Sequence, residues 1–177
     1  MGTLAEALAE FCASVTYEKL PTDVAAAAHD RFLDWLGVAL GGATSSEIFP
    51  IDRVVRETAA QGMARTMTGY RTTAPLAALV NGCAAHAHDF DDTCPESMVH
   101  IGAPVIAAAL ATAETVGASG AELLAAVVVG YEVASRIGKA INRPPRMAHH
   151  RRGFHPTGTC AVFGAAAAAS RIFRLPE

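Results

Sequence analysis

Long alanine-rich apolar segments, bounded by helix-capping or helix-breaking residues, constrain the fold of this chain most strongly. The segment 122–142 is apolar nearly all round at its centre, which is typical of a buried helix. Residues 157–173 are mostly small, so neighbouring helices can pack closely against them. Apolar residues make up 51% of the 177 residues, enough for a core and for apolar surface left to bury against another chain. We therefore predict a single all-α domain, 1–177, built as a helical bundle of about seven helices.

Capping boxes and prolines predict where these helices begin and end. Thr3 forms a capping box with Glu6, and Ser119 forms one with Glu122. The expected helices cover residues 3–14, 22–42, a segment from 50 onward, 73–92, 102–116, 119–142 and 157–173. Residues 64–71, ARTMTGYR, form the one plausible strand, short and at an edge.

Charge and cysteine usage exclude several classes of protein. The net charge of -3 gives no reason to expect nucleic acid or an anionic membrane as a partner. No apolar run reaches the roughly 18 residues that a membrane span needs, and the N-terminus lacks the pattern of a signal peptide. The four cysteines are scattered without a C-x-x-C pair. We interpret them as reduced, mostly buried thiols of a cytoplasmic protein.

Titratable side chains gather at residues 86–100, HAHDFDDTCPESMVH, between two apolar segments. Charged groups in such a place are costly to desolvate, so they need partners or a catalytic task. On a helix that runs to Asp92, the side chains of His86, Asp89 and Thr93 share one face. An aspartate beside a histidine orients its imidazole, which favours acid–base chemistry.

The other members of this stretch receive simpler interpretations. We interpret Asp91 and Asp92 as carboxylates at a helix end that face water. His86 and His88 are interpreted as residues that serve helix packing and local hydrogen bonds. His100 follows the predicted helix break, so its loop can bring it back over the helix end.

A second polar stretch, residues 143–155, carries arginines and histidines just before the last helix. Its cations and the N-terminus of that helix together suit a carboxylate or phosphate ligand. We predict that Arg151 and Arg152 bind a substrate carboxylate. We interpret Arg143 and Arg146 as part of a solvated loop.

Three reaction classes could use these side chains. The dyad His88-Asp89 resembles a metal-dependent phosphohydrolase site, but the other ligands have no clear candidates. The segment 90–96, FDDTCPE, resembles an aspartate motif of prenyl-diphosphate chemistry, but Pro95 breaks the helix which that motif needs. Metal-free acid–base chemistry on a small polycarboxylate needs histidines, an orienting aspartate and cations, and all are present. We favour this third class.

Several motifs, in order along the chain, resemble the MmgE/PrpD family, which includes 2-methylcitrate dehydratases and cis-aconitate decarboxylases. The matching segments are NGCAAHAHDFDDT at 81–93, HIGAPV at 100–105, GASGAELLAAVVVGYEVASRIG at 117–138, RGFHPTGT at 152–159 and GAAAAAS at 164–170. The resemblance implies a lyase without metal or organic cofactor. It also implies a large helical domain, a smaller lid domain and a dimer.

Carried over residue by residue, the resemblance implies that Asp89, His100 and His155 are catalytic and that Thr93 binds substrate. We expect His100 and His155 to transfer protons and Asp89 to orient one of them. The Thr93 hydroxyl would hydrogen-bond a substrate carboxylate. Family members often have proline where this chain has Ile101, a difference that bears on substrate choice.

The resemblance covers about residues 20–173, whereas family members are more than twice as long as this chain. Their lid domain, with a lysine and a tyrosine of the active site, has no counterpart here. Because the lid excludes water and brings cations, we expect this chain to be one part of a split lyase. A second chain would supply the lid, or the chain would form a homodimer. The alternative is a truncated, non-catalytic helical domain acting as an oligomeric or binding module.

Overall fold

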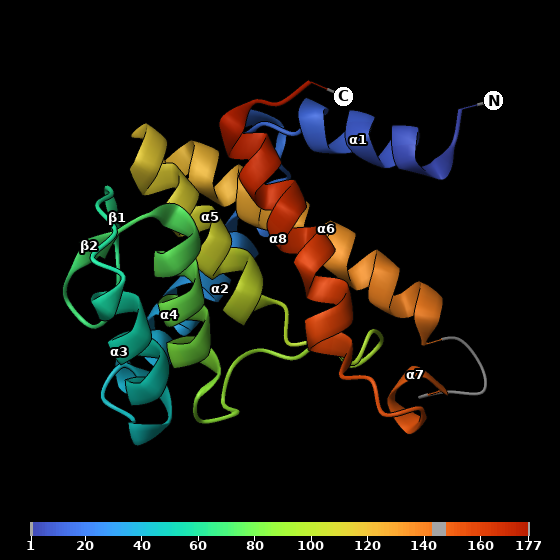
Figure 1. Ribbon diagram of the computed structural model, residues 1–177. Helices are drawn as coiled ribbons and strands as arrows, with labels where there is room; N and C mark the ends of the chain where they lie inside the picture. The colour runs from blue at the N-terminus through green and yellow to red at the C-terminus, as the bar shows by residue number, and fades with distance from the viewer. Residues whose placement is uncertain (1, 143–147, 177) are drawn as a thin grey trace.

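The computed structural model describes residues 2–142 and 148–176, and it confirms the all-α class (Figure 1). Within these residues there are eight α-helices: α1 (Leu4–Ser14), α2 (Thr22–Gly42), α3 (Phe49–Glu57), α4 (Ala74–His86), α5 (Gly102–Val116), α6 (Gly120–Ile141), α7 (Ala148–Arg151) and α8 (Pro156–Phe173). Two short 3₁₀ helices, η1 (Tyr17–Lys19) and η2 (Ser46–Ile48), connect the first three. Because α7 is a single turn, seven helices of more than one turn form the bundle, as predicted.

Local capping signals determine most helix ends. At α1, the Glu6 N–H donates to Thr3 Oγ1 at 3.2 Å and the Thr3 N–H donates to Glu6 Oε2 at 2.6 Å. The same reciprocal pair joins Ser119 and Glu122 at the start of α6. Both capping boxes were predicted, and each satisfies two N–H groups that the helix itself leaves unpaired.

α4 ends at His86, six residues before the predicted end. The Asp89 N–H donates to the His86 carbonyl at 3.2 Å, and Asp89 has a φ of 49°. This left-handed backbone stops a helix, and aspartate tolerates it better than most residues. The prediction that His86, Asp89 and Thr93 share a helix face is therefore wrong, because Asp89 and Thr93 lie in the loop 87–101.

The predicted strand is a hairpin. β1 (Ala64–Arg65) pairs with β2 (Arg71–Thr72) in antiparallel register. Between them the Thr66 N–H donates to the Tyr70 carbonyl at 2.8 Å, and Gly69 takes a φ of 95°. The chain therefore turns in the middle of the segment, where glycine permits the left-handed backbone.

α5 lies in the middle of the core and packs on α4, α6 and α8 (Figure 1). The crossing of α6 and α8 uses two glycines. A Cβ on Gly130 would lie 2.9 Å from the Gly164 carbonyl oxygen, and a Cβ on Gly164 would lie 2.8 Å from Ala134 Cβ. The small residues predicted to allow close packing therefore do so at this crossing.

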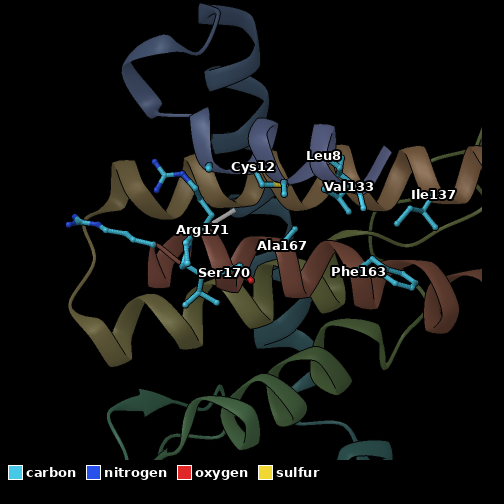
Figure 2. A pocket seen from close by; sticks show the side chains of 14 residues that line it. Leu8, Cys12, Val133, Ile137, Phe163, Ala167, Ser170 and Arg171 are labelled. Atoms are coloured by element: carbon cyan, nitrogen blue, oxygen red, sulfur yellow. The ribbon is translucent and has the colours of Figure 1, made fainter. Parts of the chain in front are cut away.

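α1 packs less closely than the other long helices and has no buried residue. Between it, α6 and α8 lies an apolar groove of about 650 Å³. Figure 2 shows Leu8 and Cys12 of α1 beside Val133 of α6, with Phe163 of α8 on the other wall. Apolar surface also remains exposed elsewhere, including Phe90, which is 80% exposed. The predicted surplus of apolar surface is thus present.

Two further findings bear on the class of protein. No helix in the described part of the chain is long and apolar enough to cross a membrane. Cys160 is buried, whereas Cys12, Cys83 and Cys94 are half-buried, and all four thiols are free. The prediction of mostly buried thiols is therefore only partly met, since one of the four is fully buried.

Candidate active site

The loop 87–101 folds back on itself beside the start of α8 (Figure 1). Cys94 and Val99 form an isolated antiparallel bridge, in which the Cys94 N–H donates to the Val99 carbonyl at 3.0 Å. Residues that flank such a bridge lie opposite each other. Thr93 and His100 are therefore brought together by the six residues between them.

Asp92 fixes the end of this loop to the start of α5. The Gly102 N–H donates to Asp92 Oδ1 at 2.8 Å, where the carboxylate also faces the positive end of the helix dipole. A Cβ on Gly102 would lie 2.6 Å from that oxygen and 2.8 Å from Tyr131 Oη, so this contact requires glycine. Burial raises the pKa of Asp92 although the Gly102 N–H donates to its carboxylate. The prediction that Asp92 faces water was wrong.

Asp92→Asn is expected to stabilise the fold increasingly as the pH rises. An amide oxygen still accepts the Gly102 N–H and has no charge to desolvate. The pKa of Asp92 is raised in the fold, so its contribution to stability is full below the unfolded-state pKa of an aspartate, and it is lost as the pH rises through the raised value. Urea midpoints of both chains between about pH 3 and 7 measure this difference. A difference that does not change with pH would contradict the burial argument.

Asp91 forms the buried centre of the site, with its side chain only 1% exposed. His86 Nδ1 lies 2.9 Å from Asp91 Oδ1 and 3.1 Å from Oδ2. His100 Nδ1 lies 3.3 Å from the same Oδ1. A buried carboxylate needs partners: the His86 imidazole forms a hydrogen bond with it, and the His100 imidazole lies at ion-pair distance. The prediction that Asp91 faces water was therefore wrong, whereas the local hydrogen bond predicted for His86 is present.

α8 brings two further residues to the site. His155 is exposed and caps the start of the helix, where its ring stacks on that of His86 with centroids 6.1 Å apart. The rings of His86 and His100 are 5.0 Å apart. Thr157 Oγ1 accepts the His100 N–H at 3.0 Å. Three histidines that are far apart in the sequence therefore lie together.

Asp89 and Thr93 lie on the exposed side of His100. Asp89 Oδ1 is 3.8 Å from His100 Nε2, and the Asp89 side chain is 81% exposed. Thr93 Oγ1 lies 3.4 Å from His100 Nδ1. We call the assembled side chains the His–Asp cluster: His86, Asp89, Asp91, Thr93, His100 and His155. It includes all four residues to which the family resemblance assigned a site role.

The arginines predicted to bind substrate do not join this cluster. Arg151 and Arg152 are exposed at the end of α7 and just after it, and within the described residues neither side chain contacts the cluster. Their binding role stays a prediction. Arg143 and Arg146 lie outside the described residues. His88 is exposed rather than packed.

Four members of the cluster could hold a metal cation. One ligand-type atom from each of His86, Asp89, Asp91 and His100 lies within 4.8 Å of the others. A mixed imidazole and carboxylate set suits transition metals such as Zn²⁺. However, the Nδ1 atoms of both imidazoles already face Asp91, so a metal bound there would have to replace those contacts.

Comparison with known proteins decides the family. The family model of the MmgE/PrpD N-terminal domain matches residues 6–177. This chain belongs to the MmgE/PrpD family. Human cis-aconitate decarboxylase is 36% identical to it over 152 residues, and the mouse protein of the same name is 35% identical over 153 residues. Each alignment covers 81% of this chain but 30% of the relative, so the chain spans about a third of their length.

The resemblance inferred from the motifs is confirmed, but three residues that the structure places at the candidate site had no predicted site role. His86 and Asp91 lie within the matching segment 81–93, and Thr157 lies within the matching segment 152–159. Their presence in a motif was the available signal. The path of the loop 87–101 determines which of Asp89, Asp91 and Asp92 turns inward. Helical periodicity does not describe that path, because the loop is not helical.

Proposed function

We propose that this MmgE/PrpD domain carries the proton-transfer groups of a lyase that dehydrates or decarboxylates a small polycarboxylate, such as 2-methylcitrate or cis-aconitate. The observation that carries the proposal is the convergence of His86, His100 and His155 beside the buried carboxylate of Asp91. The names of the two relatives support this substrate class. The reaction is proposed to need neither a metal nor an organic cofactor.

Both reactions need groups that give and take protons. In a dehydration, a base removes a proton from the carbon beside a carboxylate, the electron pair forms the double bond, and an acid protonates the hydroxyl that leaves as water. In a decarboxylation, the carbon–carbon bond breaks to release CO₂, and an acid returns a proton to the carbon. We assign these proton transfers to His100 and His155, because imidazole exchanges protons near neutral pH. Asp89 orients His100 through Nε2, and Thr93 hydrogen-bonds a substrate carboxylate.

A polycarboxylate also needs cations, which recognise it through charge-assisted hydrogen bonds. Across the described residues, no ion pair joins the His–Asp cluster to an arginine or lysine. We propose that a second chain with a lid domain, or a homodimer partner, adds these cations and excludes water. Arg151 and Arg152 are the proposed contribution of this chain. On this proposal residues 1–177 form one all-α domain of a larger assembly.

The exposed apolar surface favours a second candidate function. Leu33 is 69% exposed and Phe163 is 54% exposed, and the groove beside α1 is apolar. Such surface is typical of an interface. Residues 1–177 would then be a non-catalytic helical domain that acts as an oligomeric or binding module, and the His–Asp cluster would be a relic.

Native mass spectrometry of the protein purified from its own source tests the proposal. We expect the chain to travel with a second chain, and the complex to turn over cis-aconitate or 2-methylcitrate. A homo-oligomer of this chain without turnover would favour the non-catalytic module. Dialysis against EDTA should leave turnover unchanged, since the proposed groups are protonic. If dialysis abolishes turnover and added Zn²⁺ restores it, the reaction is metal-assisted and the proposed metal-free mechanism is wrong.

A further inference from the structure

We propose that Asp91 is a positioning residue that holds both His86 and His100 with the proton on Nδ1, so that the Nε2 atom of each ring is free to accept a proton. This inference rests on the proposed function, because it names the residue that prepares those histidines for proton transfer. It concerns an aspartate that neither the motif comparison nor the spacing of the sequence had assigned to the chemistry.

Burial and distance identify the donors. An ionised carboxylate only accepts hydrogen bonds, and the Asp91 side chain is 1% exposed, so water can reach it little. His86 Nδ1 approaches both of its oxygens, at 2.9 Å and 3.1 Å. His100 Nδ1 approaches Oδ1 at 3.3 Å. If either Nδ1 were unprotonated, its lone pair would face a carboxylate oxygen and leave a buried charge without that donor.

A competing arrangement for His100 is weaker. Thr93 Oγ1 lies 3.4 Å from His100 Nδ1, so the threonine hydroxyl could donate to that atom. This would require an unprotonated Nδ1 only 3.3 Å from the Asp91 oxygen. The contact with Asp91 is at ion-pair distance rather than in hydrogen-bond geometry, but a carboxylate charge 3.3 Å away still favours a proton over a lone pair on Nδ1. Thr93 then keeps its hydroxyl proton for a substrate carboxylate.

The tautomer determines which atom reacts. With the proton on Nδ1, His100 Nε2 is the basic atom, and Asp89 Oδ1 lies 3.8 Å from it. When Nε2 takes a proton from a substrate carbon, the C–H bond breaks, an N–H bond forms and the electron pair stays on the substrate. The resulting imidazolium has Asp91 at ion-pair distance from its Nδ1–H and Asp89 near its new Nε2–H. Asp91 therefore supports the ring in both protonation states.

His86 shares the same carboxylate and links the two catalytic histidines. Its ring is 5.0 Å from His100 and 6.1 Å from His155. The arrangement therefore fixes the His86 ring between its two neighbours.

The nitrogen shifts of ¹⁵N-labelled histidine test the tautomer directly, without any assay of activity. Long-range proton–nitrogen spectra of the intact protein, with any chain that copurifies, separate a protonated ring nitrogen from an unprotonated one. His86→Gln and His100→Gln assign the two signals. We expect a protonated Nδ1 and an unprotonated Nε2 at both residues near neutral pH. A protonated Nε2 with unprotonated Nδ1 at either residue in the native protein would overturn the proposal.

Asp91→Asn provides the matched perturbation. The amide oxygen can still accept hydrogen bonds, but the side chain loses its charge and places an NH₂ donor at the position of Oδ2, which lies 3.1 Å from His86 Nδ1. We expect at least one histidine to change to the Nε2-protonated tautomer. Asp30→Asn, which removes the charge of an exposed aspartate on α2, should change neither signal. Unchanged tautomers in folded Asp91→Asn would overturn the proposal, and the native spectrum decides it if that variant does not fold.

Activity separates this inference from the proposed function. In an active complex, Asp91→Asn should lower kcat by about 10²-fold with little change in KM. In the changed tautomer Nε2 already carries a proton and cannot accept one, whereas the contacts with substrate remain. If the native protein shows the expected tautomers but turns over neither acid, the proposed function fails and the positioning role stands. If it turns over substrate with His100 in the other tautomer, the positioning role fails and the function stands.

Discussion

His155→Ala is expected to lower the turnover of a polycarboxylate lyase reaction by about 10²-fold or more, the usual contribution of a general acid–base group. His155 is exposed at the start of α8, and its ring contact is the stacking on His86. Removing the imidazole therefore creates no buried cavity. The measurement is kcat and kcat/KM on cis-aconitate and 2-methylcitrate, with the unfolding midpoint of each variant.

Asp89→Asn should reduce turnover to a similar extent. Asparagine also tolerates the left-handed backbone that Asp89 adopts, so the loop keeps its path while the charge beside His100 is removed. His150→Ala, at a neighbouring exposed histidine of α7, is the matched control and should retain native turnover. Near-native rates in His155→Ala or Asp89→Asn would remove that residue from the mechanism.

Gly164→Ala is expected to destabilise the fold by about 1–3 kcal/mol, the typical cost of an extra group in a packed core. The new Cβ would overlap the Gly130 carbonyl oxygen and lie 2.8 Å from Ala134 Cβ. Alanine is the better helix former by about 1 kcal/mol, but this gain is smaller than the cost of separating α6 from α8. Urea unfolding followed by circular dichroism measures the difference.

Gly37→Ala is the matched control for this prediction. Gly37 lies inside α2, is exposed, and would place its Cβ with nothing within 4 Å. Only the helix propensity then changes, so the variant should gain about 1 kcal/mol of stability. If Gly164→Ala is stabilised as much as Gly37→Ala, the close crossing of α6 and α8 does not limit the packing.

Sequence alone was sufficient for the helices whose ends depend on neighbouring residues. The capping boxes at Thr3 and Ser119 join residues three positions apart, so their hydrogen bonds form wherever the helix forms. The range of α5 was also predicted, because an alanine-rich segment begins at Gly102 and the glycine-containing turn at Gly117 follows it. The family motifs likewise singled out Asp89, Thr93, His100 and His155, four side chains that the structure brings together and whose catalytic roles stay predictions.

The end of α4 and the centre of the site were decided only by the tertiary structure. The sequence predicted that α4 continues to Asp92. In the structure the helix ends at His86, and the carboxylate of Asp92 binds the start of α5. Asp91 becomes buried only because the returning loop brings His100 beside His86. Neighbouring aspartates have the same intrinsic chemistry, and the cost of desolvation depends on which partners reach each one. Those partners come from separate elements, so their arrangement is a property of the packed chain.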